Sequence, residues 1–288
     1  MILKAIKNLG RYNQLIFLAG LGVYGTIAVR YGWDLTLAAP IGVVLSIAVL
    51  SAMERLAPNR PEENGGPAEV ARDGFFFLLG AVMDTVGRIA AVTVAVALAG
   101  GQKFLNLPLW LEVILAVYIA EFFAYWFHRL SHREGWLWSI HSIHHLPEKV
   151  NLTNNFLMHP LNIFFLKLMR STPLLLLGFS QEAVFLHGLL VIGVAFSVRA
   201  NTGGRLGFWN YLIGTAELHR MHHSKDPHEA GNHGTVVPLW DQIFGTFRYQ
   251  PDGGPMAIGV TDRERYPKTI AGMLWHPLRI RTRKTATL

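Results

Sequence analysis

Cysteine is absent from this 288-residue sequence, and charged side chains are scarce. Without cysteine the chain has no disulfide, no thiolate metal site, no haem attached through cysteine and no cysteine nucleophile. A metal site must therefore use histidine, aspartate, glutamate or water. Only 16% of the residues are charged and 51% are hydrophobic, whereas soluble domains have about 25% charged residues. This shortage of charge indicates that much of the surface faces lipid.

Four long apolar runs divide the first half of the chain, and each is long enough to predict a membrane-spanning helix. The runs cover residues 14–29, 35–53, 75–99 and 107–127. The first follows a basic stretch, but its length and the apolar runs after it favour a retained helix over a cleaved signal peptide. Segment 57–68 is a polar loop. Within the third run, Asp84 and Arg88 lie four residues apart on one helical face, and we expect them to pair inside the bundle.

Lysine and arginine are distributed unevenly between the ends of these runs. With the N-terminus inside, the inner segments carry Lys4, Lys7, Arg11, Arg55, Arg60 and Arg72. The short outer loops carry only Arg30 and Lys103. This bias predicts that the inner segments are cytoplasmic. Four crossings then bring the chain back to the cytoplasmic face at His128.

The second half contains two further apolar runs, 161–177 and 183–198, which we expect to form a hairpin entering and leaving on one side. The first of them is a poor span because it contains Lys167, Arg170 and Pro173. The polar tail ends in a basic stretch of Arg279, Arg281, Arg283 and Lys284, which predicts a cap near anionic headgroups. The expected fold is all-α: a polytopic membrane bundle of about four transmembrane helices plus a hairpin, with a cytoplasmic, helical, histidine-rich cap.

Eight of the 13 histidines fall into three short clusters. These are an HxxxH (His128, His132), an HxxHH (His141, His144, His145) and a second HxxHH (His219, His222, His223). Helix positions i, i+3 and i+4 share one face, so each cluster projects its imidazoles in one direction. Imidazole suits iron, copper, zinc and nickel, and eight imidazoles exceed the needs of one ion, which favours a dinuclear centre. One HxxHH is expected by chance only roughly 0.03 times in such a chain, so two copies are a specific signal.

The order of these motifs resembles that of the fatty acid hydroxylase/sterol desaturase superfamily. Asn232-His-Gly and the downstream Trp240-Asp-Gln-Ile-Phe-Gly-Thr246 resemble that family's N-x-G and W-D-x-x-F-G-T ending, and Met158-His-Pro160 resembles its H-P element before the hairpin. The resemblance implies two non-haem irons, O2 as co-substrate, electrons from a separate protein and a lipid C–H bond as target. It also implies a catalytic domain at 73–248, between an N-terminal transmembrane hairpin with its polar loop (1–72) and a basic cytoplasmic tail (249–288).

One position departs from the family pattern. Arg199 stands where family members often have a further histidine after the hairpin. A ligand is therefore either lost or replaced by another group such as His187 or His159. The sequence leaves open whether this changes metal binding.

Four residues are candidates for additional ligands or for contacts that orient the ligands: His159, His187, Asn232 and Asp241. His187 is alternatively a hydrogen-bonded histidine of the bundle. Asp241 either accepts the ring N–H of a metal-bound histidine and so orients it, or caps a turn beside Trp240. Glu121, two helical turns before His128, either lies beneath the metals or pairs with another helix. The remaining histidines, His228, His233 and His276, are expected at the surface.

The resemblance implies a membrane-bound oxidoreductase that hydroxylates or desaturates a fatty acyl chain or sterol. The chain has no nicotinamide or flavin fingerprint, because its glycine pairs at 203–204 and 253–254 lack a strand–turn–helix setting. Electrons are therefore expected from a redox partner such as a ferredoxin or a b5-type cytochrome, which a basic face would suit. Scattered Lys and Arg without interleaved aromatics argue against a nucleic-acid partner. A bacterial inner membrane is favoured over the endoplasmic reticulum.

Three other classes stay open at this point. A b-type haem protein would need single histidines within spans, whereas these clusters lie at span ends. A metal transporter would need polar groups at mid-bilayer, where only Asp84 and His187 are candidates. A hydrolytic zinc site uses three protein ligands and an open position, which eight imidazoles exceed.

Overall fold

The computed structural model describes residues 12–100, 106–133, 135–202, 204–251, 254–255 and 257–278. Its longer helices are α2 (Asn13–Arg30), α3 (Leu35–Leu56), α4 (Pro67–Ala99), α5 (Leu109–Ser131), α6 (Trp136–His145), α7 (Pro160–Leu176), α8 (Gln181–Ser197), α9 (Ala216–His222), α10 (Leu239–Ile243) and α11 (Ile270–Trp275). No strand occurs in these ranges, apart from an isolated bridge between Ser224 and Ile258. The predicted all-helical class is confirmed.

Some residues used for the sequence predictions lie outside the described ranges. They are Lys4, Lys7, Arg11, Lys103, Gly203, Gly253 and the basic stretch 279–284.

Three of the described helices, α3, α4 and α5, are long and apolar enough to cross a membrane. Only 22%, 22% and 39% of their apolar windows are buried inside the protein, so most of these side chains face outward, as lipid contact requires. The chain is therefore a membrane protein. The sequence predicted about four spans. The first predicted span forms α2, which is not among the three because polar residues stand at both of its ends.

Helix α8 packs against both α2 and α3, and glycines permit the close approach. A Cβ atom added at Gly25 of α2 or at Gly42 of α3 would lie 2.8 Å from a methyl carbon of Leu189 on α8. Such a distance is shorter than real Cβ contacts allow, so a larger residue would require the Leu189 side chain to shift. The N-terminal helices are thus joined to the rest of the bundle through α8.

Helix α7 lies along α4, and a cross-helix ion pair joins them. A Cβ at Gly87 of α4 would lie 2.9 Å from the Phe164 carbonyl oxygen, so glycine lets the two backbones approach. Nζ of Lys167 on α7 lies 2.9 Å from Oδ1 of Asp84. The predicted pairing of Asp84 with Arg88 is wrong, because the closely packed α7 brings a lysine to that carboxylate.

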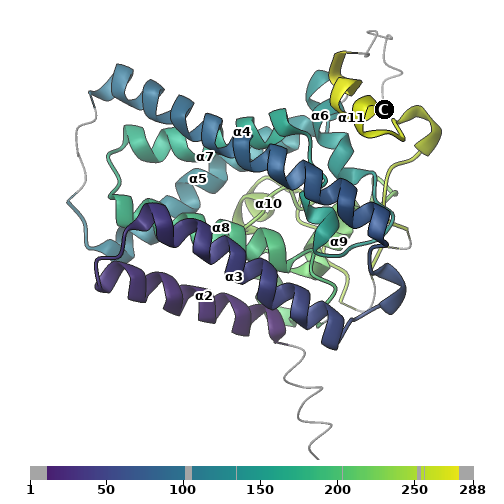
Figure 1. Ribbon diagram of the computed structural model, residues 1–288, viewed down its shortest axis with the longest axis horizontal. Helices are drawn as coiled ribbons and strands as arrows, with labels where there is room; N and C mark the ends of the chain where they lie inside the picture. Colours follow the sequence, from purple (N-terminus) through teal and green to yellow (C-terminus); the bar gives the residue numbers. More distant parts are fainter. Residues whose placement is uncertain are drawn as a thin grey trace, which may run out of the picture.

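Helices α7 and α8 form the predicted hairpin, whose turn lies at the end of the bundle away from α6 and α9 (Figure 1). Ser180 caps α8, since its hydroxyl oxygen accepts the Ala183 N–H at 3.2 Å. The buried carboxylate of Glu112 on α5 accepts the Ser180 N–H at 2.9 Å. The end of α5 that carries His128 therefore lies with α6 and α9, at the opposite end from this turn.

Candidate metal centre

The histidine clusters stand on three helices whose ends meet. His128 lies in the last turn of α5 and His132 caps that helix. Gly135, at φ +121°, precedes α6, which carries the second cluster. The third cluster lies on α9, which the Thr215 hydroxyl caps by accepting the Leu218 N–H at 3.2 Å.

The structure sorts the eight predicted histidines into two groups. The first group is His128, His132, His141, His145 and His222; the second group is His144, His219 and His223. Within each group, one ring nitrogen of every member lies within 4.8 Å of those of the others. All eight predicted residues are thus brought together, and each HxxHH cluster contributes to both groups.

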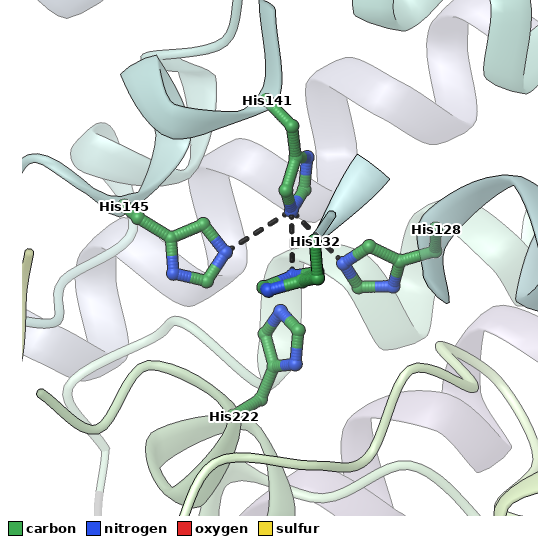
Figure 2. A group of neighbouring side chains, drawn as sticks. All are labelled: His128, His132, His141, His145 and His222. Atoms are coloured by element: carbon green, nitrogen blue, oxygen red, sulfur yellow. Dashed lines mark hydrogen bonds between the residues drawn. The ribbon is translucent and has the colours of Figure 1, made fainter. Parts of the chain in front are cut away.

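The first group converges around the ring of His141 (Figure 2). Its Nε2 lies 3.0 Å from Nε2 of His128 and 3.1 Å from Nε2 of His132. Nε2 of His145 lies 3.0 Å from the same atom. Two nitrogens bound at right angles to one ion through bonds of about 2.1 Å would lie about 3.0 Å apart. The observed spacing fits a single metal ion bound by several imidazoles.

The protonation state of the first group also fits a metal. Burial holds the pKa of His141, His145 and His222 well below its usual value, and the neighbouring imidazoles lower it further. These rings are neutral at pH 7, and metal binding requires neutral imidazole. The spacing also argues against haem, because nitrogens 3.0 Å apart leave no room for a porphyrin between them.

Two rings of the first group are oriented by carbonyls of one loop, residues 231–234. Nδ1–H of His128 donates to the His233 carbonyl at 2.6 Å. Nδ1–H of His222 donates to the Gly231 carbonyl at 2.6 Å. A proton on Nδ1 leaves the Nε2 lone pair available to a metal. Nε2 of His222 is buried and has no hydrogen-bond partner within the described ranges.

Asn232 holds this loop in shape. Its backbone is left-handed, with φ 55°, a conformation that asparagine tolerates better than most residues. Its side chain donates to the carbonyls of Leu218 at 3.1 Å and of Arg248 at 2.7 Å, and accepts the Arg248 N–H at 2.9 Å. Asn232 therefore positions the two carbonyls from outside the histidine groups.

Asp241 caps the same loop. Its carboxylate accepts the N–H groups of His233 and Gly234, each at 2.7 Å, and the Thr246 hydroxyl at 2.7 Å. Of the two roles open for Asp241, the structure shows the turn cap. Asp241 therefore orients the His128 ring only indirectly: it fixes the His233 backbone, and the His233 carbonyl accepts the Nδ1–H of His128.

Glu121 braces the loop from α5. Its carboxylate forms an ion pair with Arg170 of α7 at 2.8 Å and accepts the backbone N–H groups of Thr235 at 3.2 Å and Val236 at 3.0 Å. Of the two roles left open by the sequence, pairing with another helix is the observed one.

His233 was expected at the surface, and this expectation is wrong. Its ring centre lies 4.9 Å from that of His132 and 5.5 Å from that of His128, and burial lowers the pKa of His233 to about 3. Its place in the N-x-G motif was the only sequence signal of a position near the metal centre, since the turn at Asn232 directs the His233 ring towards the first group. His228 is exposed as predicted, whereas His276 is half-buried against Tyr266.

The two remaining candidates, His159 and His187, belong to neither group. His159 caps α7: its Nδ1 accepts the Leu161 N–H at 3.2 Å, and its Nε2–H donates to the Leu274 carbonyl at 3.2 Å. His187 is buried on α8 near Glu121. Neither histidine takes the place of the family histidine at whose position this chain has Arg199.

Arg199 lies among the second group and is only 1% exposed. Its Nη2 donates to Nε2 of His223 at 2.6 Å and to Nε2 of His144 at 3.0 Å. Its Nε–H donates to Nε2 of His219 at 2.9 Å. The guanidinium therefore uses the nitrogens that a second metal ion would need. The first group has its nitrogens free for a metal ion, whereas those of the second group are in contact with Arg199.

Alanine at Gly231 is expected to weaken metal binding about 10- to 100-fold, the usual cost of losing a contact that orients a ligand. An added Cβ would lie 2.4 Å from the Thr246 carbonyl oxygen, so the loop must shift and carry the carbonyl away from His222. Competition with a chelator measures the affinity. Gly188→Ala is the matched control because its Cβ would meet nothing within 4 Å; equal affinities in the two variants would refute this role of the loop.

Comparison with known proteins places the chain in a family. Residues 113–246 match the family model described as fatty acid hydroxylase. The ornithine lipid hydroxylase OlsE of Rhizobium tropici is 30% identical over 229 residues, which cover 76% of this chain and 69% of that protein. The chain belongs to the fatty acid hydroxylase family. The predicted superfamily is confirmed, and with it the prediction of an oxidoreductase.

Two further members of the superfamily match about half of the chain. Human alkylglycerol monooxygenase is 30% identical over 151 residues, covering 50% of this chain and 33% of that protein. Methylsterol monooxygenase 2-2 of Arabidopsis thaliana is 33% identical over 158 residues, covering 51% and 58%. The chain thus spans well under two thirds of these two relatives. No solved structure matches it.

Proposed function

We propose that this chain is a membrane-bound lipid hydroxylase that uses non-haem iron held by the first group. The observation that carries the proposal is the convergence of five imidazoles at spacings that fit one ion. Family membership supports a redox metal, because the relatives are named hydroxylases and monooxygenases and zinc has no redox chemistry. The two irons predicted from the sequence would also require the second group, whose nitrogens are bound by Arg199.

The proposed reaction converts a lipid C–H bond to C–OH. One atom of O2 enters the product and the other leaves as water, with two electrons and two protons supplied through a separate donor protein. Bound iron would supply the redox chemistry that activates O2. The chain itself keeps Nε2 of His128 and His222 directed at the ion, through the loop 231–234. The buried position of the group limits the access of water.

The proposed substrate is a fatty acyl chain or sterol in the bilayer. The outward apolar faces of α3, α4 and α5 support it, because α6 and α9, which carry six of the eight clustered histidines, lie at one end of these helices (Figure 1). We place that end at the cytoplasmic face, of a bacterial inner membrane by preference. Arg55, Arg60 and Arg72 flank the membrane helices at this end, in accord with the positive-inside rule. A ferredoxin or b5-type cytochrome remains the proposed donor.

Lipid mass spectrometry tests this function. The full chain is produced in a bacterial host under iron-replete conditions, and its membrane lipids are compared with those of cells producing His222→Ala. A lipid gaining one oxygen atom only with the wild-type chain is the expected result. If the lipid instead gains a double bond and no oxygen, the reaction is desaturation and the proposed hydroxylation is wrong. Identical lipids in both cultures, with donor protein supplied, would refute the proposal.

A further inference from the structure

The side chain of Arg199 is bound on every side. Besides its contacts with the three imidazoles, Nη1 donates to Oδ1 of Asn154 at 2.8 Å, and the two N–H groups of Nη2 are shared with a third acceptor, the His144 carbonyl oxygen at 3.1 Å. The guanidinium thus has a partner for each of its three nitrogens, which is what a buried cation needs to be stable. Histidines that accept at Nε2 have no lone pair left there for a metal.

The backbone around Arg199 is fixed as well. The buried Glu54 carboxylate of α3 accepts the N–H groups of Asn201 at 2.6 Å and of Leu152 at 2.7 Å. The Asn201 side chain donates to the Arg60 carbonyl at 2.7 Å. The chain just after Arg199 is therefore tied to α3 and to the loop that follows it, which holds the guanidinium at the second group.

The guanidinium also supplies positive charge where a second metal ion would. Burial lowers the pKa of Arg199 to about 9, while the nearby Asp73 carboxylate opposes that shift, so the side chain is charged at neutral pH. Burial, and then the charge of Arg199, keep the pKa of His144, His219 and His223 well below its usual value. A divalent ion bound to the same nitrogens would be in contact with this cation and repelled by it.

We propose that this chain binds one metal ion, in the first group, and that the Arg199 guanidinium takes the place of a second ion in the second group. This inference rests on the proposed function only for the presence of the first ion. It makes the centre mononuclear, with an internal cation beside the metal. His145 and His223, whose rings stack with centres 4.1 Å apart, join the two groups.

The test is the metal content of the detergent-purified full chain, with zinc as a redox-inactive probe and elemental mass spectrometry as the readout. The wild type is expected to hold one zinc per chain. Arg199→His removes the guanidinium and adds an imidazole, so this variant is expected to hold two. Adding His223→Ala to the Arg199→His variant is expected to lower its zinc content from two ions to one. The same substitution in the wild-type chain is expected to leave the single zinc ion in place.

Three results would overturn the inference. The first is a wild-type chain that holds two zinc ions and loses one of them in His223→Ala. The second is a wild-type chain whose single zinc is lost in His223→Ala but kept in His141→Ala. The third is an Arg199→His variant that folds but still holds one zinc. The wild-type count decides the matter even if a variant fails to fold. A wild-type chain with one zinc that oxidises no lipid in its iron-loaded form would leave this inference standing and remove the proposed function.

Discussion

Replacing His141 with alanine is expected to reduce lipid oxidation by more than about 100-fold and to remove the bound metal, since loss of a contact that merely orients a ligand already costs up to that factor. The reason is its central position: the Nε2 atoms of His128 and His132 lie 3.0 and 3.1 Å from its own Nε2. Without it, the remaining rings lose their common partner. Product formation and metal content, measured on the same preparation, check the prediction.

His228→Ala is the matched control for this substitution. It removes the same side chain from an exposed position outside both histidine groups, so oxidation and metal content are expected to stay at wild-type values. An His141→Ala variant that keeps its metal and its activity would show that the first group is a buried histidine cluster without a metal role.

Leucine in place of Glu121 is expected to lower the free energy of unfolding by about 3–5 kcal/mol, the usual cost of leaving one member of a buried ion pair uncompensated. Glu121 is fully buried, and Arg170 is left without its 2.8 Å partner. The N–H groups of Thr235 and Val236 lose their acceptor as well. Unfolding in detergent, followed by circular dichroism, measures the change.

Two comparisons make the Glu121 result specific. Glu148→Leu breaks an exposed pair with Lys225 at 2.6 Å, and is expected to cost less than about 1 kcal/mol because water screens it. The double variant Glu121→Leu/Arg170→Leu is expected to recover part of the lost stability, since no buried charge remains unpaired. Equal losses for Glu121→Leu and Glu148→Leu would contradict the bracing role of Glu121.

The histidine ligand candidates could be predicted from sequence because helical spacing is a local property. Residues i, i+3 and i+4 share a face wherever the helix lies, so HxxHH predicts converging rings before the fold is known. The division into two groups could not be predicted. Adjacent positions on a helix point about 100° apart, and His144 and His145 therefore join different groups. Which group each one faces depends on how α6 packs against α5 and α9.

The features missed from sequence all depend on contacts between distant segments. His233 approaches the first group only because the backbone turns through a positive φ at Asn232. Asp84 pairs with Lys167 rather than Arg88 because Gly87 lets α7 come close. Arg199 was recognised as a departure from the family pattern, but the sequence could not place its guanidinium on the second group. That position is set by three helices and two loops that are far apart in the chain.

Oxygen-isotope labelling tests the central claim most directly. Cells producing the wild-type chain or His141→Ala are grown under oxygen-18 gas, and their lipids are examined by mass spectrometry. The account predicts a lipid that carries one heavy oxygen atom with the wild type and no such lipid with His141→Ala. A new hydroxyl group that carries only light oxygen from water, or heavy oxygen that appears equally with both chains, would contradict it.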